Sequence, residues 1–508
     1  MSKTSPTHLH GEEEKPWQEH VEVASYEGDS APVPGHVKRP ARVFTKEEED
    51  KIYRKVDWHL MPTVAILYLL SFMDRGNIGN ARLEGLEAEL GMDSQQYNLA
   101  LSCFFITYCL CEVPSNLILK KCRPSYYIGT ITFLWGVVMT CMGLVQNFGG
   151  LLATRLFLGV AEAGLFPGII LLLSLYYPRH RSQARVAFFF GAATIAGAFS
   201  GLLAYGIGFM GGVGGYAGWR WIFILEGLAT VVWGVVTVFI LPPYPHQVKW
   251  LTPEERDWLV YCKAIDSGAH GEAEEVGKKY VWQAFGDWQC WLSLGHYMGV
   301  VTPLYAISLF LPTILNSFGK YTRPQVQLLS VPVYVAAFIF VMAVGIIADK
   351  KKTRFPFMML ELVLCAVGLI INLTPAPQGV KFFGLFLIAM GAYGGLPTTV
   401  TWLSNNLSGQ TKRAVGSAFQ IGIGNLAALA STNVYRTQDK PHYYLGHGVV
   451  LGFVALGLVC APLYAYLLKR ENARKAAELA RPASERRQYT VEELRDMGDR
   501  SPEFKYTI

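Results

Sequence analysis

The chain contains little charge. Only 17% of its 508 residues are Asp, Glu, Lys or Arg, whereas 51% are hydrophobic. A soluble chain with two polar tails would need more charge to cover its surface. Apolar runs of about 20 residues recur instead, and a helix of this length crosses the hydrocarbon core of a bilayer. The scarcity of charge therefore excludes an ordinary soluble protein and predicts a multi-pass membrane protein.

Cysteine is also scarce, and its spacing forms no framework. Seven of the nine cysteines lie in apolar runs, namely Cys103, Cys109, Cys111, Cys141, Cys290, Cys365 and Cys460. We expect these to be small buried hydrophobes rather than disulfides or metal ligands. The sequence Gly206-x-Gly208-x-x-Gly211 fits a dinucleotide fingerprint, but no strand precedes it. Because no nucleophile–base arrangement or Walker motif is present either, we expect no metal, no cofactor and no enzyme activity.

Twelve apolar runs fall into two sets of six. The expected spans are roughly 59–81, 96–119, 125–146, 149–177, 184–209, 219–242, 289–315, 325–348, 355–373, 381–404, 413–435 and 446–468. The domains expected are an N-terminal tail (1–57), a six-helix bundle (58–242), a central loop (243–288), a second six-helix bundle (289–469) and a C-terminal tail (470–508). The predicted fold is therefore an all-α membrane protein of twelve transmembrane helices in two bundles, and we expect no cleavable signal peptide.

Basic residues concentrate in alternate loops between these spans. If the N-terminus is cytoplasmic, the cytoplasmic loops hold Lys120, Lys121, Arg123, Arg179, Arg181, Arg185, Lys350, Lys351, Lys352, Arg354, Lys412 and Arg413. The opposite loops hold only Arg82, Lys320, Arg323, Lys381, Arg436 and Lys440. The positive-inside rule predicts that both termini are cytoplasmic. Because topology accounts for these clusters, the net charge of +6 gives no reason to expect a nucleic acid partner.

Two expected spans carry paired charges. Asp74 and Arg75 lie in the first span, whereas Arg155 and Glu162 lie in the fourth, on one helix face and roughly 10 Å apart along the axis. Ionised side chains are costly in a bilayer, and those that remain usually face a cavity and carry function. We therefore expect a solute and proton pathway here, with an ion pair that only locks helices as the alternative. Glu112 in the second span is a further candidate.

Several motifs together indicate a family. They are Asp74-Arg75-Gly76-Asn77, Arg155-x-x-x-Gly159-x-x-Glu162, Gly345-x-x-x-Asp349-Lys350, Leu241-Pro-Pro-Tyr244-Pro245 and Tyr435-Arg436-x-x-Asp439-x-Pro441. At these residues the chain resembles the major facilitator superfamily, and the combination is similar to its fungal anion:cation symporters, the allantoate, nicotinate and pantothenate permease-like proteins. The first-half copy of the loop motif lacks the usual glycine and aspartate. The resemblance covers about residues 57–470 and implies two bundles that rock around a site at the midplane.

The resemblance also implies a role for individual residues. Arg75 and Arg155 would bind an anion, and a lining segment at Thr401 and Trp402, together with Asn425, would contact it; packing is the alternative for Trp402. Asp74, Glu162 and Glu112 are the proton-coupling candidates. Glu162 is the preferred carrier, because an anion that competes for a neighbouring arginine would favour its protonation. Asp349 and Lys350 would latch a cytoplasmic gate.

The function expected is secondary active transport, as proton-coupled symport of a small organic anion across the plasma membrane. The partners are then the anion, protons and the bilayer, and a monomer suffices. One alternative is an exporter, or a vacuolar transporter, of an acidic metabolite, because the same fold and charges serve either direction. Another is a nutrient receptor that signals without transport, although the tails are short for such a protein. The substrate itself is not readable from the sequence.

Overall fold

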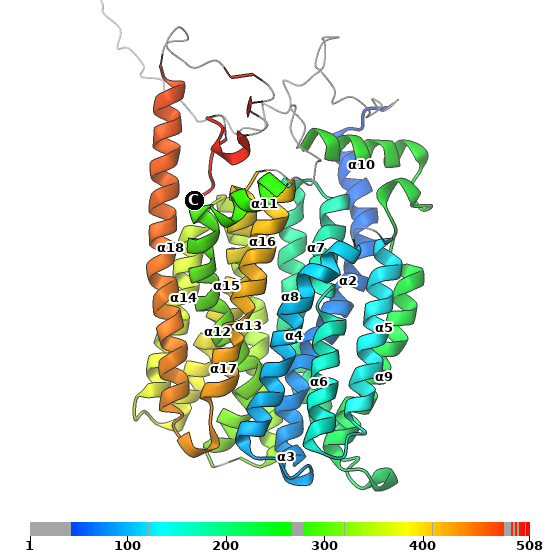
Figure 1. The fold of residues 1–508 in the computed structure, drawn as a ribbon, viewed down its shortest axis with the longest axis vertical. Coiled ribbons are helices and arrows are strands. Elements are labelled where there is room, and N and C mark those ends of the chain that lie inside the picture. Colours follow the sequence, from blue (N-terminus) through cyan, green and yellow to red (C-terminus); the bar gives the residue numbers. More distant parts are fainter. Residues whose placement is uncertain are drawn as a thin grey trace, which may run out of the picture.

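Long helices run side by side along most of the chain (Figure 1). The computed structural model describes residues 42–119, 122–266, 278–319, 321–408, 410–481, 489–490, 493–494, 497–502 and 504–508. Both ends of the described chain lie at one end of the helices, together with α10 (Pro253–Asp266) and α11 (Lys278–Phe285). We call this end the tail side. The opposite end, which carries α3 (Leu86–Glu89), is the far side.

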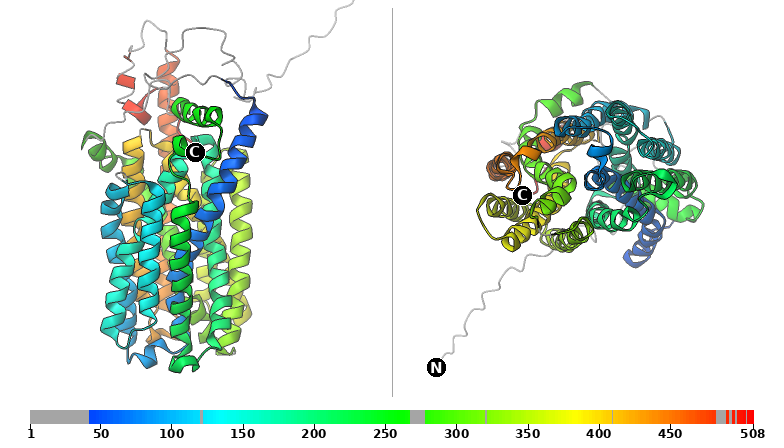
Figure 2. Two further views of the ribbon diagram at one scale, coloured as in Figure 1. Left: turned by 90° about the vertical axis from the view of Figure 1, so that its right-hand side faces the viewer. Right: turned by 90° about the horizontal axis from the view of Figure 1, so that it is seen from below.

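The helices form two groups, which lie next to each other in the end-on view of Figure 2. The first group contains α2 (Lys46–Leu83), α4 (Ser94–Leu119), α5 (Pro124–Met142), α6 (Phe148–Glu162), α7 (Leu165–Tyr176), α8 (Arg179–Gly208) and α9 (Gly218–Ile240). The second contains α12 (Trp288–Ser317), α13 (Arg323–Lys351), α14 (Phe355–Leu373), α15 (Gln378–Asn406), α16 (Gln410–Asn425), α17 (Ala428–Val434) and α18 (Tyr444–Leu479). Between the groups, α8 packs on α13, α2 on α12 and α4 on α17.

The all-helical membrane fold is confirmed. Within the described residues, ten helices are long and apolar enough to cross a membrane, with most of α6 and α7 counted as one span, Phe148–Ile170. The two remaining elements that accompany them are α4 and the pair formed by α16 and α17. These agree with the twelve expected spans. Helices suit a bilayer because they satisfy every interior backbone hydrogen bond within one segment.

The first helix begins earlier than expected, inside the stretch assigned to the N-terminal tail. A capping box starts α2: the Thr45 hydroxyl accepts from the Glu48 backbone N–H, and the Glu48 carboxylate accepts from the Thr45 backbone N–H at 3.0 Å. That backbone hydrogen bond holds the pKa of Glu48 below its usual value. Farther along α2, Asp57 accepts from Tyr177 Oη and Arg185 Nη2, both at 2.7 Å. The helix extension is thus fastened to α7 and α8.

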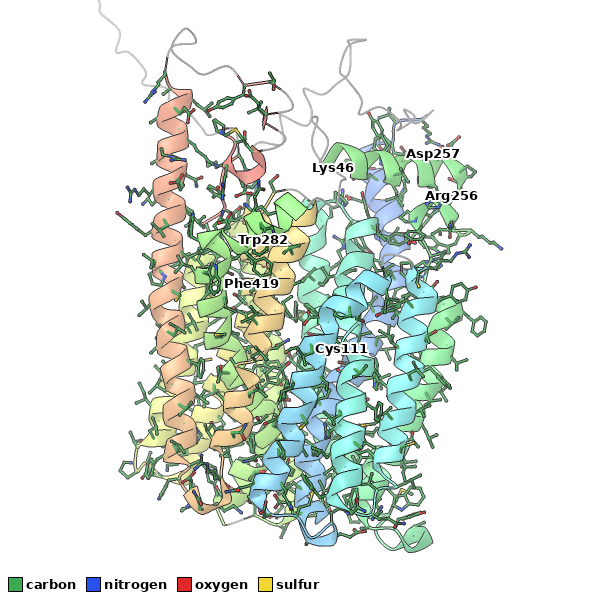
Figure 3. All side chains as sticks on the ribbon, in the orientation of Figure 1. Lys46, Cys111, Arg256, Asp257, Trp282 and Phe419 are labelled. Atoms are coloured by element: carbon green, nitrogen blue, oxygen red, sulfur yellow. The ribbon has the colours of Figure 1, made fainter. Side chains whose placement is uncertain are left out.

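The central polar stretch 243–288 also contains helices. In Figure 3, Arg256 and Asp257 mark α10, which lies on the tail side near Lys46 at the start of α2. The side chain of Trp282 on α11 is 74% exposed, and the neighbouring Phe285 packs edge-on against Phe419 of α16 at 5.4 Å. Exposed tryptophan is typical of the boundary between a membrane and water. We therefore interpret α11 as an interfacial helix.

The C-terminal segment, residues 497–502 and 504–508, docks on the tail side of the second group. The Thr507 carbonyl accepts from Trp402 Nε1 and from Asn406 Nδ2, each at 3.0 Å. Asp499 is 1% exposed and accepts from Lys412 Nζ at 2.7 Å. Lys412 Nζ also donates to Asp287, the N-cap of α12, at 2.6 Å. One buried lysine therefore joins the C-terminal segment to the starts of α12 and α16.

Replacing Lys412 by methionine should destabilise the protein strongly. Asp287 and Asp499 would then be left as buried carboxylates without their cation, and removing one partner of a buried pair costs about 3–5 kcal/mol. We expect a lower apparent melting temperature in a fluorescence melt of the purified protein. Asp499→Asn is the matched control, because Lys412 keeps Asp287 as a partner, and its effect should be clearly smaller. Equal melting of wild type and Lys412→Met would contradict the proposed importance of this ion pair.

Contacts between the two groups close the far side. A Cβ atom placed on Gly79 of α2 would lie only 2.6 Å from the backbone oxygen of Leu309 on α12, so the two backbones approach closely there. Ser102 of α4 lies 3.0 Å from the Thr432 hydroxyl of α17. Gln327 of α13 donates to Glu84 at 3.2 Å. The structure is therefore closed on the far side.

Gly79→Ala should hinder this closure. The added methyl group meets a backbone atom, which cannot rotate away, and overpacking of this kind typically costs about 1–3 kcal/mol. The population of the closed state should fall roughly tenfold, since about 1.4 kcal/mol changes a population tenfold. Gly76→Ala is the control, because its Cβ atom would lie 3.7 Å from Ser200 Oγ and 3.8 Å from the Ser308 oxygen, which are ordinary contacts. The measurement is the rate at which a cysteine introduced at position 330 is labelled from the far side. This rate should rise in Gly79→Ala and should not change in Gly76→Ala.

Candidate functional site

A central cavity of about 380 Å³, measured out to its opening, lies between the two groups. Half of its lining residues are aromatic, and Arg75 is the one charged residue among the described residues that line it. The lining consists of Tyr68, Phe72, Arg75, Tyr108, Phe166, Phe190, Tyr297, Val301, Leu304, Tyr305, Leu396, Val400, Ile421 and Asn425. Cavities with an apolar wall and few polar groups are typical small-molecule sites.

The charge in this cavity wall is paired with a carboxylate behind it. Arg75 Nε of α2 donates to Glu162 Oε1 of α6 at 2.7 Å. Ser71, one turn earlier on α2, donates to the same oxygen at 2.5 Å. The side chain of Glu162 is fully buried, and its second oxygen, Oε2, has no hydrogen-bond partner. Glu162 can therefore either form an ion pair with Arg75 or bind a proton.

Arg75 also connects the two groups of helices. Its Nη1 donates to the Tyr305 hydroxyl of α12 at 3.0 Å. Its guanidinium carbon lies 4.8 Å from the ring centre of Tyr108 and 5.2 Å from that of Phe72. Aromatic faces attract cations at such distances. The guanidinium is thus held in one orientation by a carboxylate, a phenol and two rings, and part of it faces the cavity.

Asp74 faces away from this cavity, although it is adjacent to Arg75 in sequence. Its Oδ2 accepts from Trp135 Nε1 of α5 at 2.7 Å and from the Thr230 hydroxyl of α9 at 3.4 Å. The side chain is fully buried, and Oδ1 has no partner. Neighbouring helix positions point about 100° apart, so a single helix presents the acid and the base to different surroundings.

Arg155 is placed differently from the expectation. It is 1% exposed, does not line the cavity, and has no hydrogen-bond partner at Nε or Nη2. The groups that interact electrostatically with Arg155 are Tyr97, Glu162 and Asp74. The sequence put Arg155 and Glu162 on one face of α6, but the ion pair that forms joins Glu162 to Arg75. Arg155 is therefore a buried charge behind the cavity, and its role in anion binding stays a prediction.

Two helices are interrupted at candidate residues. Glu162 is the last residue of α6, and α7 resumes at Leu165; Asn425 is the last residue of α16, and α17 resumes at Ala428. Asn425 lines the cavity, where its Oδ1 accepts from the Tyr297 hydroxyl at 3.4 Å. The backbone stays in the α-helical region at Ala163, Gly164 and Ala427, so both interruptions are short irregularities rather than unwound segments.

Glu112 lies where α4 meets α16. The residue is 1% exposed, and a Cβ atom on Gly422 of α16 would lie 3.6 Å from Glu112 Oε2. That oxygen has no hydrogen-bond partner. Its place between the two groups fits a proton-coupling role, which no contact in the structure tests.

The remaining candidates lie apart from the cavity. Trp402 is fully buried near the tail side, where its indole bonds to the C-terminal segment and its ring packs against Tyr464 at 4.7 Å. The Thr401 hydroxyl donates to the Pro397 carbonyl of its own helix at 2.7 Å. Neither lines the cavity. Asp349 and Lys350 lie in the last turn of α13, but the Asp349 side chain is outside the described part, so the gate stays a prediction.

Sequence reasoning missed the aromatic wall. Tyr68, Tyr108, Tyr297 and Tyr305 all line the cavity. The hydroxyl of Tyr305 accepts from Arg75, and that of Tyr297 donates to Asn425. A tyrosine in an apolar run looks like any other core aromatic in the sequence. A weak signal was present, because a buried phenol hydroxyl usually needs a polar partner.

The comparison with known proteins decides the family. Residues 64–432 match the Major Facilitator Superfamily. The chain belongs to this superfamily. The MFS-type transporter cnsO of Penicillium expansum is 34% identical over 479 residues, which cover 92% of each chain. The high-affinity nicotinic acid transporter of Saccharomyces cerevisiae is 30% identical over 459 residues, covering 90% of this chain and 85% of that one. Both relatives are named as transporters, which confirms the expectation that the chain is not an enzyme.

Solved structures agree on the fold. A bacterial homologue of the human lysosomal transporter Spinster, in an inward-facing and unoccupied conformation, gives a TM-score of 0.58 at 16% identity, covering 83% of this chain and 97% of that one. The proton:xylose symporter XylE gives a TM-score of 0.59 at 16% identity, covering 79% and 94%. At this identity the similarity shows the superfamily architecture alone. The chain is thus a multi-pass membrane protein of a transporter superfamily.

Proposed function

We propose that this superfamily member is a proton-coupled symporter of a small organic anion, in the fungal anion:cation symporter branch. The observation that carries the proposal is the Arg75–Glu162 pair, in which the guanidinium lines the cavity and the carboxylate lies behind it at 2.7 Å. A planar guanidinium suits a carboxylate better than an ammonium group does. The aromatic wall favours an anion with a ring or an apolar body.

The same pair supplies a coupling mechanism. A substrate carboxylate in the cavity would accept hydrogen bonds from Arg75 and from the Tyr305 hydroxyl, which bond to each other now. It would compete with Glu162 for the guanidinium. A buried carboxylate that loses its cation is costly unless it takes up a proton. Anion and proton binding would then favour each other, and both would leave together.

The proposed orientation places the tail side in the cytoplasm. Both ends of the described chain lie on that side, which agrees with an even number of spans. Helix ends there carry Arg181, Arg185, Lys350, Lys351, Arg354 and Lys412, and basic residues favour the cytoplasmic face. The far side, closed in this structure, would then face the exterior. Residence in the plasma membrane, uptake rather than export, and a monomeric state belong to the same proposal.

Uptake by purified protein in liposomes would test this function. We would compare labelled nicotinate with its neutral amide, and extend the panel to aliphatic and dicarboxylic acids, with and without an inward proton gradient. Nicotinate enters the panel because one relative is named a nicotinic acid transporter. The expected result is accumulation of one or more carboxylates that requires the gradient, with no accumulation of the amide. Gradient-independent uptake, or transport of neutral compounds only, would overturn the proposal.

A further inference from the structure

A second group of buried carboxyls lies behind the cavity, between α2 and α9. Asp74 of α2 accepts from Thr230 of α9, and Asn77, three residues after Asp74, donates to Glu226 of α9. Glu226 precedes Thr230 by one helical turn. The two contacts therefore interlock, and they bring the carboxyls of Asp74 and Glu226 into one polar layer between the helices.

Glu226 has no cation as a partner. It is 3% exposed, its Oε1 has no hydrogen-bond partner, and no ion pair joins it to a base among the described residues. Asp74 is the ionisable group that interacts electrostatically with Glu226. Arg75 is committed to Glu162, and Arg155 interacts with Asp74 and Glu162 rather than with Glu226.

The charges of this region balance only with a proton. Three carboxyls, Asp74, Glu162 and Glu226, face two guanidinium groups, Arg75 and Arg155. If all were ionised, the buried region would carry at least one uncompensated negative charge, because Arg75 also interacts with the buried Glu112, and such a charge is costly in a water-free interior. A bound proton reduces that charge by one. Glu226 is its best position, because it alone of the three has no arginine in reach.

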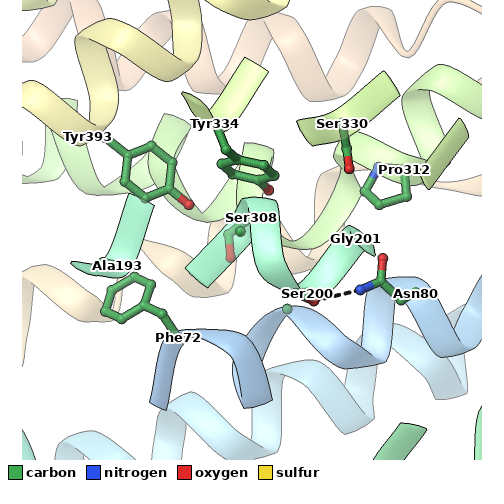
Figure 4. A pocket seen from close by; sticks show the side chains of 12 residues that line it. Phe72, Asn80, Ala193, Ser200, Gly201, Ser308, Pro312, Ser330, Tyr334 and Tyr393 are labelled. Atoms are coloured by element: carbon green, nitrogen blue, oxygen red, sulfur yellow. Dashed lines mark hydrogen bonds between the residues drawn. The ribbon is translucent and has the colours of Figure 1, made fainter. Parts of the chain in front are cut away.

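A hydrogen-bonded chain leads from Glu226 to a second cavity. Asn77, which donates to Glu226, accepts from the Ser200 hydroxyl of α8 at 2.9 Å, and Ser200 accepts from Asn80 at 2.7 Å. Figure 4 shows Ser200 and Asn80 in the wall of this cavity, which has about 340 Å³ of empty space. Ser308 and Tyr334 complete a polar lining from the second group of helices.

This second cavity is placed to change its access during transport. One wall belongs to α2 and α8 and the other to α12, α13 and α15, so separation of the two groups on the far side would open it. Gly79, at the far-side contact, is adjacent to Asn80 in the cavity wall. Water from the far side would then reach Ser200 and Asn80. Because the Asn77 amide does not relay protons, water that passes these residues would deliver the proton to the unpartnered Oε1 of Glu226.

We propose that Glu226 is a second proton-binding site of the transport cycle, separate from Glu162 and loaded from the far side through the cavity at Asn80 and Ser200. Asn77 and Ser200 are positioning residues that hold Glu226 toward this cavity. The inference rests on the proposed function for its role in coupling, but the bound proton itself can be detected without any substrate.

Glu226→Gln in the full-length protein tests the proposal, with Glu361→Gln as the control. Glu361 is also a fully buried carboxyl, but it lies on α14 and accepts from Thr398 at 3.0 Å, away from α2 and α9. In liposomes, the reversal potential gives the number of protons moved with each anion. This number should fall by one in Glu226→Gln and stay unchanged in Glu361→Gln. An unchanged number in Glu226→Gln would overturn the proposal.

Infrared spectroscopy of the substrate-free protein supplies a readout that needs no transport. The neutral carboxyl absorption that disappears as the pH is raised should lose one component in Glu226→Gln, and wild type and Glu361→Gln should both retain that component. If Glu226→Gln does not fold, Asn77→Ala replaces it. Loss of the amide hydrogen bond should then let this component persist to higher pH, because that bond favours the ionised form.

These results separate the two proposals. Wild type without proton-coupled uptake of any carboxylate would refute the proposed function, while the infrared band would still decide whether Glu226 binds a proton. If coupled uptake is found but the titrating component survives Glu226→Gln, or does not move in Asn77→Ala, the second proton site is refuted and the proposed function stands.

Discussion

Glu162→Gln is expected to remove the proton that is coupled to capture of the anion, so that accumulation of the anion against its gradient falls sharply while exchange of internal for external anion continues. The amide keeps the shape of the side chain and an oxygen that can accept from Ser71 and Arg75, so the cavity wall should be preserved. It cannot take up a proton when the anion captures Arg75. The anion would also compete with a neutral oxygen instead of a carboxylate, so its affinity should hold or rise and lose its pH dependence.

One variant, Asp74→Asn, provides the comparison for this result. Asp74→Asn removes a carboxyl that bonds to Trp135 and Thr230 rather than to Arg75, so it should leave the pH dependence of anion affinity in place. Flux measured with equal anion on both sides, and then with a proton gradient alone, separates exchange from accumulation. If Asp74→Asn shows exchange without accumulation and Glu162→Gln accumulates normally, the two carboxyls have the opposite roles. If both accumulate normally, Glu226 and Glu112 become the candidate carriers.

The fold was predictable because a bilayer allows few solutions. Length and hydropathy located the helices, since every spanning segment must satisfy its own backbone hydrogen bonds. What lies outside the hydrocarbon was harder to predict. The start of α2 at Lys46 had a readable signal, the capping box of Thr45 and Glu48. Docking of the C-terminal segment had none, because a lone Asp499 in a polar tail does not reveal the lysine that it will meet.

The candidate site was predictable in its members but not in its pairing. An acid and a base in an apolar run are visible from the sequence, and so Asp74, Arg75, Arg155 and Glu162 were found. Helical periodicity relates positions within one helix, and it suggested that Arg155 lies near Glu162. It carries no information on which other helix supplies the partner, and in the structure Glu162 at the end of α6 pairs with Arg75 of α2.

Trp402 shows the limit of identifying a binding residue by its chemistry. A large aromatic side chain beside Thr401 in an expected span suits a ligand cavity and a packed core equally well. In the structure it packs against Tyr464 and bonds to the Thr507 carbonyl. The aromatic rings that do line the cavity come from α2, α4, α7, α8 and α12, and only the three-dimensional arrangement separates them from the many that fill the core.

Arg75→Gln is expected to eliminate anion binding. The variant removes the one charged side chain among the described residues that line the cavity, and truncating one partner of a buried charge pair costs about 2–5 kcal/mol. Affinity for the transported carboxylate should fall at least about thirtyfold, since each 1.4 kcal/mol is tenfold. Arg75→Lys should be intermediate, because an ammonium group cannot bond to Glu162 and Tyr305 in the same planar geometry. Equilibrium binding of the labelled anion measures both.

Loss of binding in Arg75→Gln could also arise from Glu162, which would be left buried without its cation. The double variant Arg75→Gln, Glu162→Gln removes both charges together, so it should melt closer to wild type than Arg75→Gln does. If Arg75 binds the anion directly, the double variant is stable and still fails to bind, and the selectivity for a carboxylate over its neutral amide is lost. If binding returns in the double variant, Arg75 serves only to neutralise Glu162. The anion must then be held by another cation, and Arg155, a buried arginine whose Nε and Nη2 have no partner, becomes the candidate.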